Sequence, residues 1–125
     1  MIWDWHDAAL VVAGVIGSGV AIVHGVLTQR LVVGPLRQLA GARLPPTVLR
    51  LLAGLMQFST FNWFLGGLAL IVAAGFLDAE ARLVAAVLVG SSYLFGAVGN
   101  FWATRGRHPG WALYTVALLL IAYGV

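Results

Sequence analysis

The apolar segment RLLAGLMQFSTFNWFLGG, residues 50–67, contains four polar side chains within six positions. They are Gln57, Ser59, Thr60 and Asn62. Amide and hydroxyl groups inside a membrane can hold helices together through interhelical hydrogen bonds, or they can bind or pass a small ligand. Both interpretations fit the residue types, so the sequence leaves this choice open.

His24 is the one side chain in an apolar segment that titrates near neutral pH. A neutral imidazole can ligate haem or a metal, carry a proton, or make a structural hydrogen bond. A haem b site with one His per subunit needs a symmetric dimer or an open axial position. No Asp or Glu lies inside an apolar segment, so the acid or base that a hydrolase needs is missing. We therefore expect no enzymatic activity.

Composition identifies the kind of protein that positions these residues. Hydrophobic residues make up 62% of the chain, charged residues 9%, and the mean hydropathy is +0.99. Soluble domains contain about 25% charged residues, so we expect an all-α integral membrane four-helix bundle. One domain, residues 1–125, is predicted to have spans at about 8–29, 48–76, 82–104 and 110–125, with an interfacial loop at 31–46.

The basic residues are seven Arg and no Lys. Six of them flank the loops that follow the first and third spans, and only Arg82 lies on the opposite side. Positive charge favours the cytoplasmic side, so both termini are predicted to lie outside, in the periplasm. Trp3, Trp5, Trp102 and Trp111 are expected to anchor the helices at the interfaces. Since the charges mark topology, we expect no nucleic-acid partner.

Arg105 and Arg107 lie in the segment RGRHPGW, residues 105–111. Both are expected as topology anchors, and an anionic head group docked on them is the functional alternative. The chain has no Cys, which excludes disulfides and thiolate metal sites.

Depth in the membrane relates polar residues on different helices. At about 1.5 Å per helical residue, His24, Gln57 and Asn100 lie about 8–10 Å from the nearest cytoplasmic Arg, and Tyr114 lies at a similar depth. A second level follows at about 18 Å. These depths predict a polar layer shared by several helices. Its candidate ligand-binding residues are His24, Gln57, Thr60, Asn62, Tyr93 and Asn100.

Small residues recur every four positions on two of the predicted helices. Such ladders permit close helix packing, either within the monomer or in a homodimer, and a homodimer is expected here. The ladders are Ala13, Gly17, Ala21 and Gly25 on the first helix, and Ser92, Gly96 and Asn100 on the third.

Three stretches together resemble a group of small bacterial four-helix inner-membrane proteins of unassigned function. They are HGVLTQRLVVGPL (24–36), RLLAGLMQFSTFNW (50–63) and RGRHPGW (105–111). In that group a His in the first helix is followed by Pro-Leu, and a Trp-His pair precedes Thr and Trp in the second. The matching residues here are His24, Pro35, Leu36, Thr60 and Trp63.

Met56 and Gln57 stand where that group has Trp-His. The resemblance therefore implies a bacterial inner (plasma) membrane protein that lacks the second intramembrane His, which counts against a bis-His haem or metal site and leaves Gln57 as a hydrogen-bonding substitute. The string FSTF (58–61) is similar to one in the fluoride channels, but it lies in the second span, without their Gly-rich and Thr-rich lead-in. Small multidrug transporters share the size, yet their intramembrane Glu has no counterpart here.

Three hypotheses on function follow. The first is a non-enzymatic inner-membrane protein whose polar layer binds or passes a small ligand. The alternative is a structural or accessory subunit of a membrane complex, and the third is a haem-binding or quinone-binding membrane protein. The sequence identifies no cofactor. The expected partners are the lipid bilayer, a second copy of the chain and an unidentified membrane protein.

Overall fold

The structure is a computed structural model that describes residues 4–125, and this part of the chain contains helices and no strand. The all-α prediction is therefore confirmed. The elements are α1 (Trp5–Thr28), the π-helical η1 (Gln29–Val33), α2 (Gly34–Ala40), α3 (Pro46–Phe76), α4 (Ala79–Thr104) and α5 (Gly110–Gly124). Trp3, predicted as an interfacial anchor, lies outside the described residues.

The helix ends follow from local side-chain chemistry. Asp4 and Asp7 form a capping box at the start of α1, and the Asp78 carboxylate accepts a hydrogen bond from the Ala81 N–H at the start of α4. The Asp7 backbone N–H also lowers the pKa of the Asp4 carboxyl, because the hydrogen bond favours its charged form. Helix α3 begins at Pro46, whose missing N–H costs nothing in the first turn.

The first helical segment is longer than expected. Residues 31–46 were expected to form an interfacial loop, but the chain stays helical as far as Ala40. Pro35 lacks an N–H, and its ring crowds the preceding turn of a regular α-helix. The π-helical turn just before it widens the backbone, with the Gly34 N–H bonded to the Gln29 carbonyl, and the helix continues through the proline.

Within residues 4–125, three helical segments are long and apolar enough to cross a membrane. They are Trp5–Ala40 (36 residues), Pro46–Phe76 (31 residues) and Ala79–Thr104 (26 residues). Helix α5 is apolar but has 15 residues, about 22 Å, against about 30 Å of hydrocarbon. The fourth predicted span is therefore a short helix.

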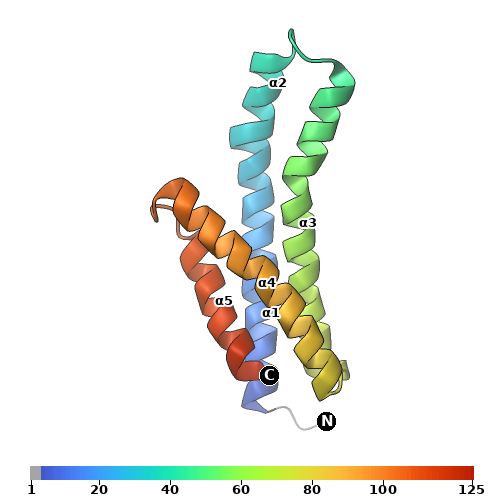
Figure 1. Ribbon diagram of the computed structural model, residues 1–125, viewed down its shortest axis with the longest axis vertical. Helices are drawn as coiled ribbons and strands as arrows, with labels where there is room; N and C mark the ends of the chain where they lie inside the picture. Colours follow the sequence, from blue (N-terminus) through green and yellow to red (C-terminus); the bar gives the residue numbers. More distant parts are fainter. Residues whose placement is uncertain (1–3) are drawn as a thin grey trace.

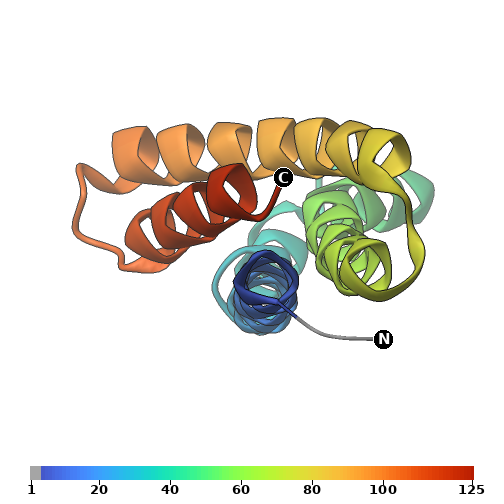
Figure 2. The same ribbon diagram turned by 90° about the horizontal axis from the view of Figure 1, so that it is seen from below.

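The long helices make an antiparallel hairpin, and the shorter pair covers one half of it (Figure 1). Helices α1 and α3 run side by side along the long axis, α4 crosses them at an angle, and α5 packs against α1 and α4. Seen from below, α4 lies across one side of the bundle, α5 and α3 lie beneath different parts of it, and α1 lies on the far side (Figure 2). The α2 end of the hairpin extends beyond the α4–α5 turn.

Polar contacts join α1, α3, α4 and α5 at the end opposite α2. The Arg82 guanidinium forms an ion pair with the Asp7 carboxylate at 2.8 Å and donates to the Ala74 carbonyl at 3.0 Å. His6 Nδ1 lies 2.7 Å from the Tyr123 carbonyl oxygen, and the two rings stack. The start of α1 and the end of α5 therefore lie together at this end.

The core depends on close approach between helices. Ala13 and Ala21 are fully buried, and a Cβ at Gly17 would overlap the Tyr93 hydroxyl. On α4, a Cβ at Gly96 would lie 2.7 Å from the Trp63 ring. Both small-residue ladders therefore pack inside this chain.

Candidate ligand-binding site

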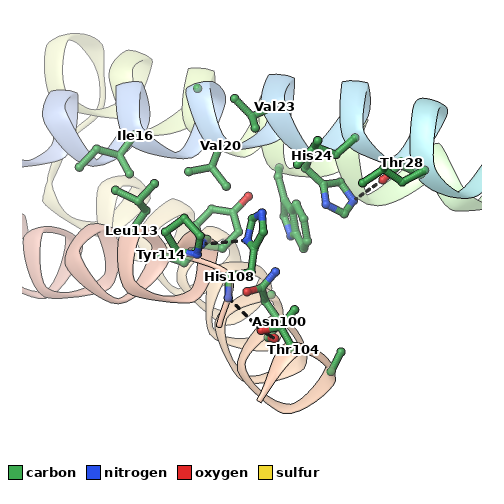
Figure 3. A pocket seen from close by; sticks show the side chains of 18 of the residues that line it. Ile16, Val20, Val23, His24, Thr28, Asn100, Thr104, His108, Leu113 and Tyr114 are labelled. Atoms are coloured by element: carbon green, nitrogen blue, oxygen red, sulfur yellow. Dashed lines mark hydrogen bonds between the residues drawn. The ribbon is translucent and has the colours of Figure 1, made fainter. Parts of the chain in front are cut away.

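A cavity of about 690 Å³ lies between α1, the C-terminal part of α4, the α4–α5 turn and the start of α5 (Figure 3). Helix α1 and the following η1 supply one long wall, because their lining residues recur at alternating steps of one and three from Val15 to Val32 and so share a face. The facing wall includes Asn100, His108 and Tyr114. The close-up shows side chains from both walls converging on this space.

His24 projects from the α1 wall and is held by neighbours on two sides. Its Nε2 lies 3.1 Å from the Ser59 hydroxyl of α3 and 3.4 Å from the Thr28 hydroxyl one turn along α1. The imidazole also meets the Trp63 ring edge to face, with centroids 4.8 Å apart. These contacts orient the ring at the cavity wall, and they occupy the nitrogen that a haem iron would use.

Two buried polar atoms on the facing wall have no hydrogen-bond partner: Asn100 Oδ1 and the Tyr114 hydroxyl oxygen. The third such atom among residues 4–125, Arg82 Nε, lies at the other end of the bundle. Leaving a buried polar group unpaired costs about 1–3 kcal/mol. Both residues line the cavity, but these two atoms are buried from it, so a ligand there would contact other atoms of Asn100 and Tyr114.

Aromatic packing fixes the Tyr114 side chain. Its ring stacks on Tyr93 with centroids 4.7 Å apart and meets Trp63 edge to face at 5.1 Å. Tyr114 is 2% exposed and Tyr93 is 0% exposed, so neither ring can swing away to hydrate its hydroxyl.

The α4–α5 turn brings a second histidine to the cavity. Arg105 and Gly106 have positive φ values of 52° and 73°, which end α4 and reverse the chain. His108 then lies against the start of α5, where its Nδ1 accepts a hydrogen bond from the Gly110 N–H at 3.1 Å. Nδ1 is therefore unprotonated, and the neutral ring carries its proton on Nε2.

Thr104 links the turn to α4. Its hydroxyl donates to the Asn100 backbone carbonyl at 2.7 Å and accepts from the His108 backbone N–H at 3.4 Å. Trp63, Thr104 and His108 were not among the predicted site residues. A signal existed in the sequence, because Asn100, Thr104 and His108 recur every four residues across the end of α4.

Gln57 and Thr60 lie apart from this cavity. The Gln57 amide donates to the Gly25 carbonyl at 3.0 Å and accepts from the Thr60 hydroxyl at 2.9 Å. Both line a smaller cavity of about 320 Å³ with Ile22, Phe61 and Phe64. Of the predicted ligand-binding residues, the larger cavity thus brings together His24 and Asn100.

Asn62 and Tyr93 join helices instead of lining a cavity. The Asn62 amide donates to the Ser92 hydroxyl at 2.8 Å, and the Tyr93 hydroxyl donates to the Trp63 carbonyl at 3.3 Å. Both bonds run between α3 and α4. The Ser18 hydroxyl makes a similar bond from α1, to the Phe64 carbonyl at 3.2 Å.

Arg105 and Arg107, the predicted head-group residues, are exposed beside the cavity and do not line it. The described residues of the lining carry no Asp, Glu, Lys or Arg, so its polar groups are imidazole, amide, hydroxyl and indole. No group of three or more His, Cys, Asp or Glu that could hold a metal ion occurs within residues 4–125.

Comparisons with family models, with curated proteins and with solved structures found no match to this chain.

Proposed function

We propose that this chain is a non-enzymatic protein of the bacterial inner membrane that binds a lipid-soluble small molecule between α1, α4 and α5. The observation that carries the proposal is a mainly apolar cavity of about 690 Å³ with a few polar side chains in its lining, among them His24, Asn100 and His108. A concave apolar site with a few converging polar groups is the usual form of a small-molecule site.

The proposed orientation places the α2–α3 connection and the α4–α5 turn in the cytoplasm, with both termini outside and α5 as a short fourth span. The six Arg near those connections support it. The one Arg on the other side, Arg82, is paired with Asp7, so its charge is compensated there. The cavity then lies in the cytoplasmic half of the membrane.

A structural or accessory subunit of a membrane complex is the second candidate function. Gln57, Asn62 and Tyr93 favour it, because their hydrogen bonds join helices within the chain. Asn62 is also an exposed amide, and Asn side chains promote helix association in membranes.

Native mass spectrometry of protein extracted in mild detergent tests the proposal, with Gly19→Leu as the blocking variant. Gly19 lines the cavity, and a Cβ there meets nothing within 4 Å, so the first atom of a larger side chain fits and the rest reduces the space left for a ligand. Gly54→Leu is the matched control, since Gly54 is exposed on α3, also has open space and lies away from the cavity.

We expect the wild type and the Gly54→Leu variant to retain an added mass, soluble in organic solvent, that the Gly19→Leu variant loses. An identical spectrum for all three proteins, with no added mass even after incubation with total membrane lipid, would favour the structural function.

A further inference from the structure

The cavity is an elongated groove that opens at the protein surface. The wall formed by α1 and η1 runs from Val15 to Val32, about 26 Å along the helix axis. Val15, Val23 and Leu113 line the groove and are 58%, 55% and 45% exposed. Because Val15 and Val23 lie on a segment apolar enough to cross a membrane, the opening faces lipid when that segment spans the bilayer. A long apolar chain can therefore enter the groove sideways.

Positive charge lies beside the groove at the α4–α5 turn. Arg105 follows Thr104 in the chain and Arg107 precedes His108, and both of these neighbours line the groove. The two arginine side chains are exposed and stand outside the lining. They therefore adjoin the mouth of the groove, where an anionic head group can reach them while its apolar part lies inside.

The carboxylate side chains of the protein lie far from these two arginines. They belong to Asp4, Asp7, Asp78 and Glu80. These four residues lie at the starts of α1 and α4, which Figure 1 shows at the end opposite α2. The ion pair present within residues 4–125 joins Asp7 to Arg82 at that end. Glu80 and Arg105 stand at opposite ends of α4, about 38 Å apart along its axis. An anion that complements Arg105 and Arg107 therefore comes from outside the chain.

Uncharged hydrogen-bonding groups come next along the groove, and aliphatic groups follow them. Thr28, Thr104 and His108 line the part near the turn. His108 offers its Nε2–H as a donor, because its Nδ1 accepts from the Gly110 N–H. Figure 3 shows the order along α1, with His24 and Thr28 toward one end and aliphatic side chains toward the other. The lining of the aliphatic part is Val15, Ile16, Gly19, Val20, Val23 and Leu113.

We propose, on the basis of the function proposed above, that the groove binds an anionic phospholipid of the membrane. Its phosphate lies against Arg105 and Arg107, its uncharged ester groups lie beside His108, and one acyl chain follows the aliphatic wall. The second acyl chain stays in the bilayer, because the groove is open to lipid. Arginines near a membrane surface attract anionic head groups. A phospholipid is favoured over a fatty acid, because its esters supply acceptors where the groove has uncharged donors.

The test titrates three lipid probes onto the delipidated full chain in mild detergent and counts bound lipids by native mass spectrometry. Palmitoyl-oleoyl-phosphatidylglycerol and palmitoyl-oleoyl-phosphatidylcholine share their acyl chains and differ in net head charge. Oleate carries a charge but has neither a phosphate nor an ester. Each probe is measured on the wild type, on the Gly19→Leu variant, which has less space in the groove, and on the Gly54→Leu control.

Two double variants locate the head group. Arg105→Gln with Arg107→Gln removes the two charges beside the groove. Arg43→Gln with Arg50→Gln is the matched control, because both of these arginines are exposed and neither lines the groove nor adjoins a lining residue in the chain. Since both double variants lower the net charge equally, a difference between them reports the position of the charge.

Phosphatidylglycerol should bind the wild type at least about tenfold more tightly than phosphatidylcholine or oleate, since one basic residue near an anionic head group contributes about fivefold. Gly19→Leu should weaken the binding of phosphatidylglycerol about tenfold or more, and Gly54→Leu should leave it unchanged. The double variant at Arg105 and Arg107 should reduce the preference for phosphatidylglycerol over phosphatidylcholine to about twofold or less. The double variant at Arg43 and Arg50 should keep this preference.

Three outcomes contradict the proposal while leaving the proposed function standing, provided that Gly19→Leu still prevents binding. Equal binding of the two phospholipids would exclude an anionic head group, and equal binding of oleate would identify a fatty acid instead. Equal effects of the two double variants would exclude a head group at the α4–α5 turn. If no probe binds in a manner that Gly19→Leu prevents, and extracted protein carries no added mass, both proposals are wrong.

Discussion

Gly17 and Gly19 lie two residues apart on α1 and meet different surroundings. A Cβ at Gly17 would overlap the Tyr93 hydroxyl and lie 2.7 Å from Tyr93 Cε2, whereas a Cβ at Gly19 meets nothing within 4 Å. Tyr93 cannot move aside easily, because it is fully buried, stacked on Tyr114 and hydrogen-bonded to the Trp63 carbonyl. The same substitution should therefore have opposite effects at the two positions.

The magnitudes follow from two effects. Replacing Gly by Ala inside a helix favours folding by about 0.5–1 kcal/mol, and this gain applies at both positions. Overpacking a rigid core costs about 1–3 kcal/mol and applies only at Gly17. We expect Gly17→Ala to lower the free energy of unfolding by about 1–2 kcal/mol, and Gly19→Ala to raise it by about 0.5–1 kcal/mol.

Reversible unfolding in mixed micelles, followed by far-ultraviolet circular dichroism, measures both variants. Adding Tyr93→Phe to Gly17→Ala removes the atom nearest to the new methyl group, so the double variant should recover about 0.5–1 kcal/mol relative to additivity. Equal shifts of the same sign at Gly17 and Gly19, with no coupling to Tyr93, would show that helix propensity alone decides and would refute the close approach.

Three further predictions test other parts of the molecule. Arg82→Gln should lower the free energy of unfolding by about 1–3 kcal/mol, because it leaves the Asp7 carboxylate partly buried and unpaired. A double-mutant cycle with Asp7→Asn should show coupling between the two positions. Additive effects would argue against the ion pair. Gln57→Leu should cost about 1 kcal/mol through its lost interhelical bond yet leave the added mass in native mass spectra unchanged. Loss of that mass would place Gln57 in the ligand site. Since the chain has no Cys, single Cys substitutions at Arg43 and Glu80 can be labelled with a membrane-impermeant thiol reagent. We expect Glu80→Cys to react from the periplasm and Arg43→Cys only after the membrane is opened, and the reverse pattern would invert the proposed topology.

Helix positions could be read from the sequence because their signals are local. Long apolar runs end at Pro, Asp or Arg-Gly, and each of these residues acts on its own turn of backbone. The region around Pro35 was misjudged because proline normally breaks a helix. The structure accommodates it with a π-helical turn, an adjustment that depends on the preceding five residues together.

The candidate site could be predicted only in part. Depth along a helix follows from counting residues, so the sequence placed His24 and Asn100 at one level, and the structure brings both to one cavity. Counting does not give the direction in which a side chain points relative to other helices. Gln57 lies at the same counted depth, but it faces Gly25 and lines a different cavity.

The sequence by itself determined the helical class, the approximate helix ends and the asymmetry of its Arg residues, because hydrophobic periodicity, capping and charge are properties of short stretches. Only the tertiary structure decided which polar groups meet. Helix α4 crosses the α1–α3 hairpin at an angle (Figure 1), the cavity lies between α1, α4 and α5, and the turn after α4 brings His108 to it. The same packing leaves Asn100 Oδ1 and the Tyr114 hydroxyl without hydrogen-bond partners. These features could not be read from the sequence, because a helix crossing angle depends on contacts between residues far apart in the chain.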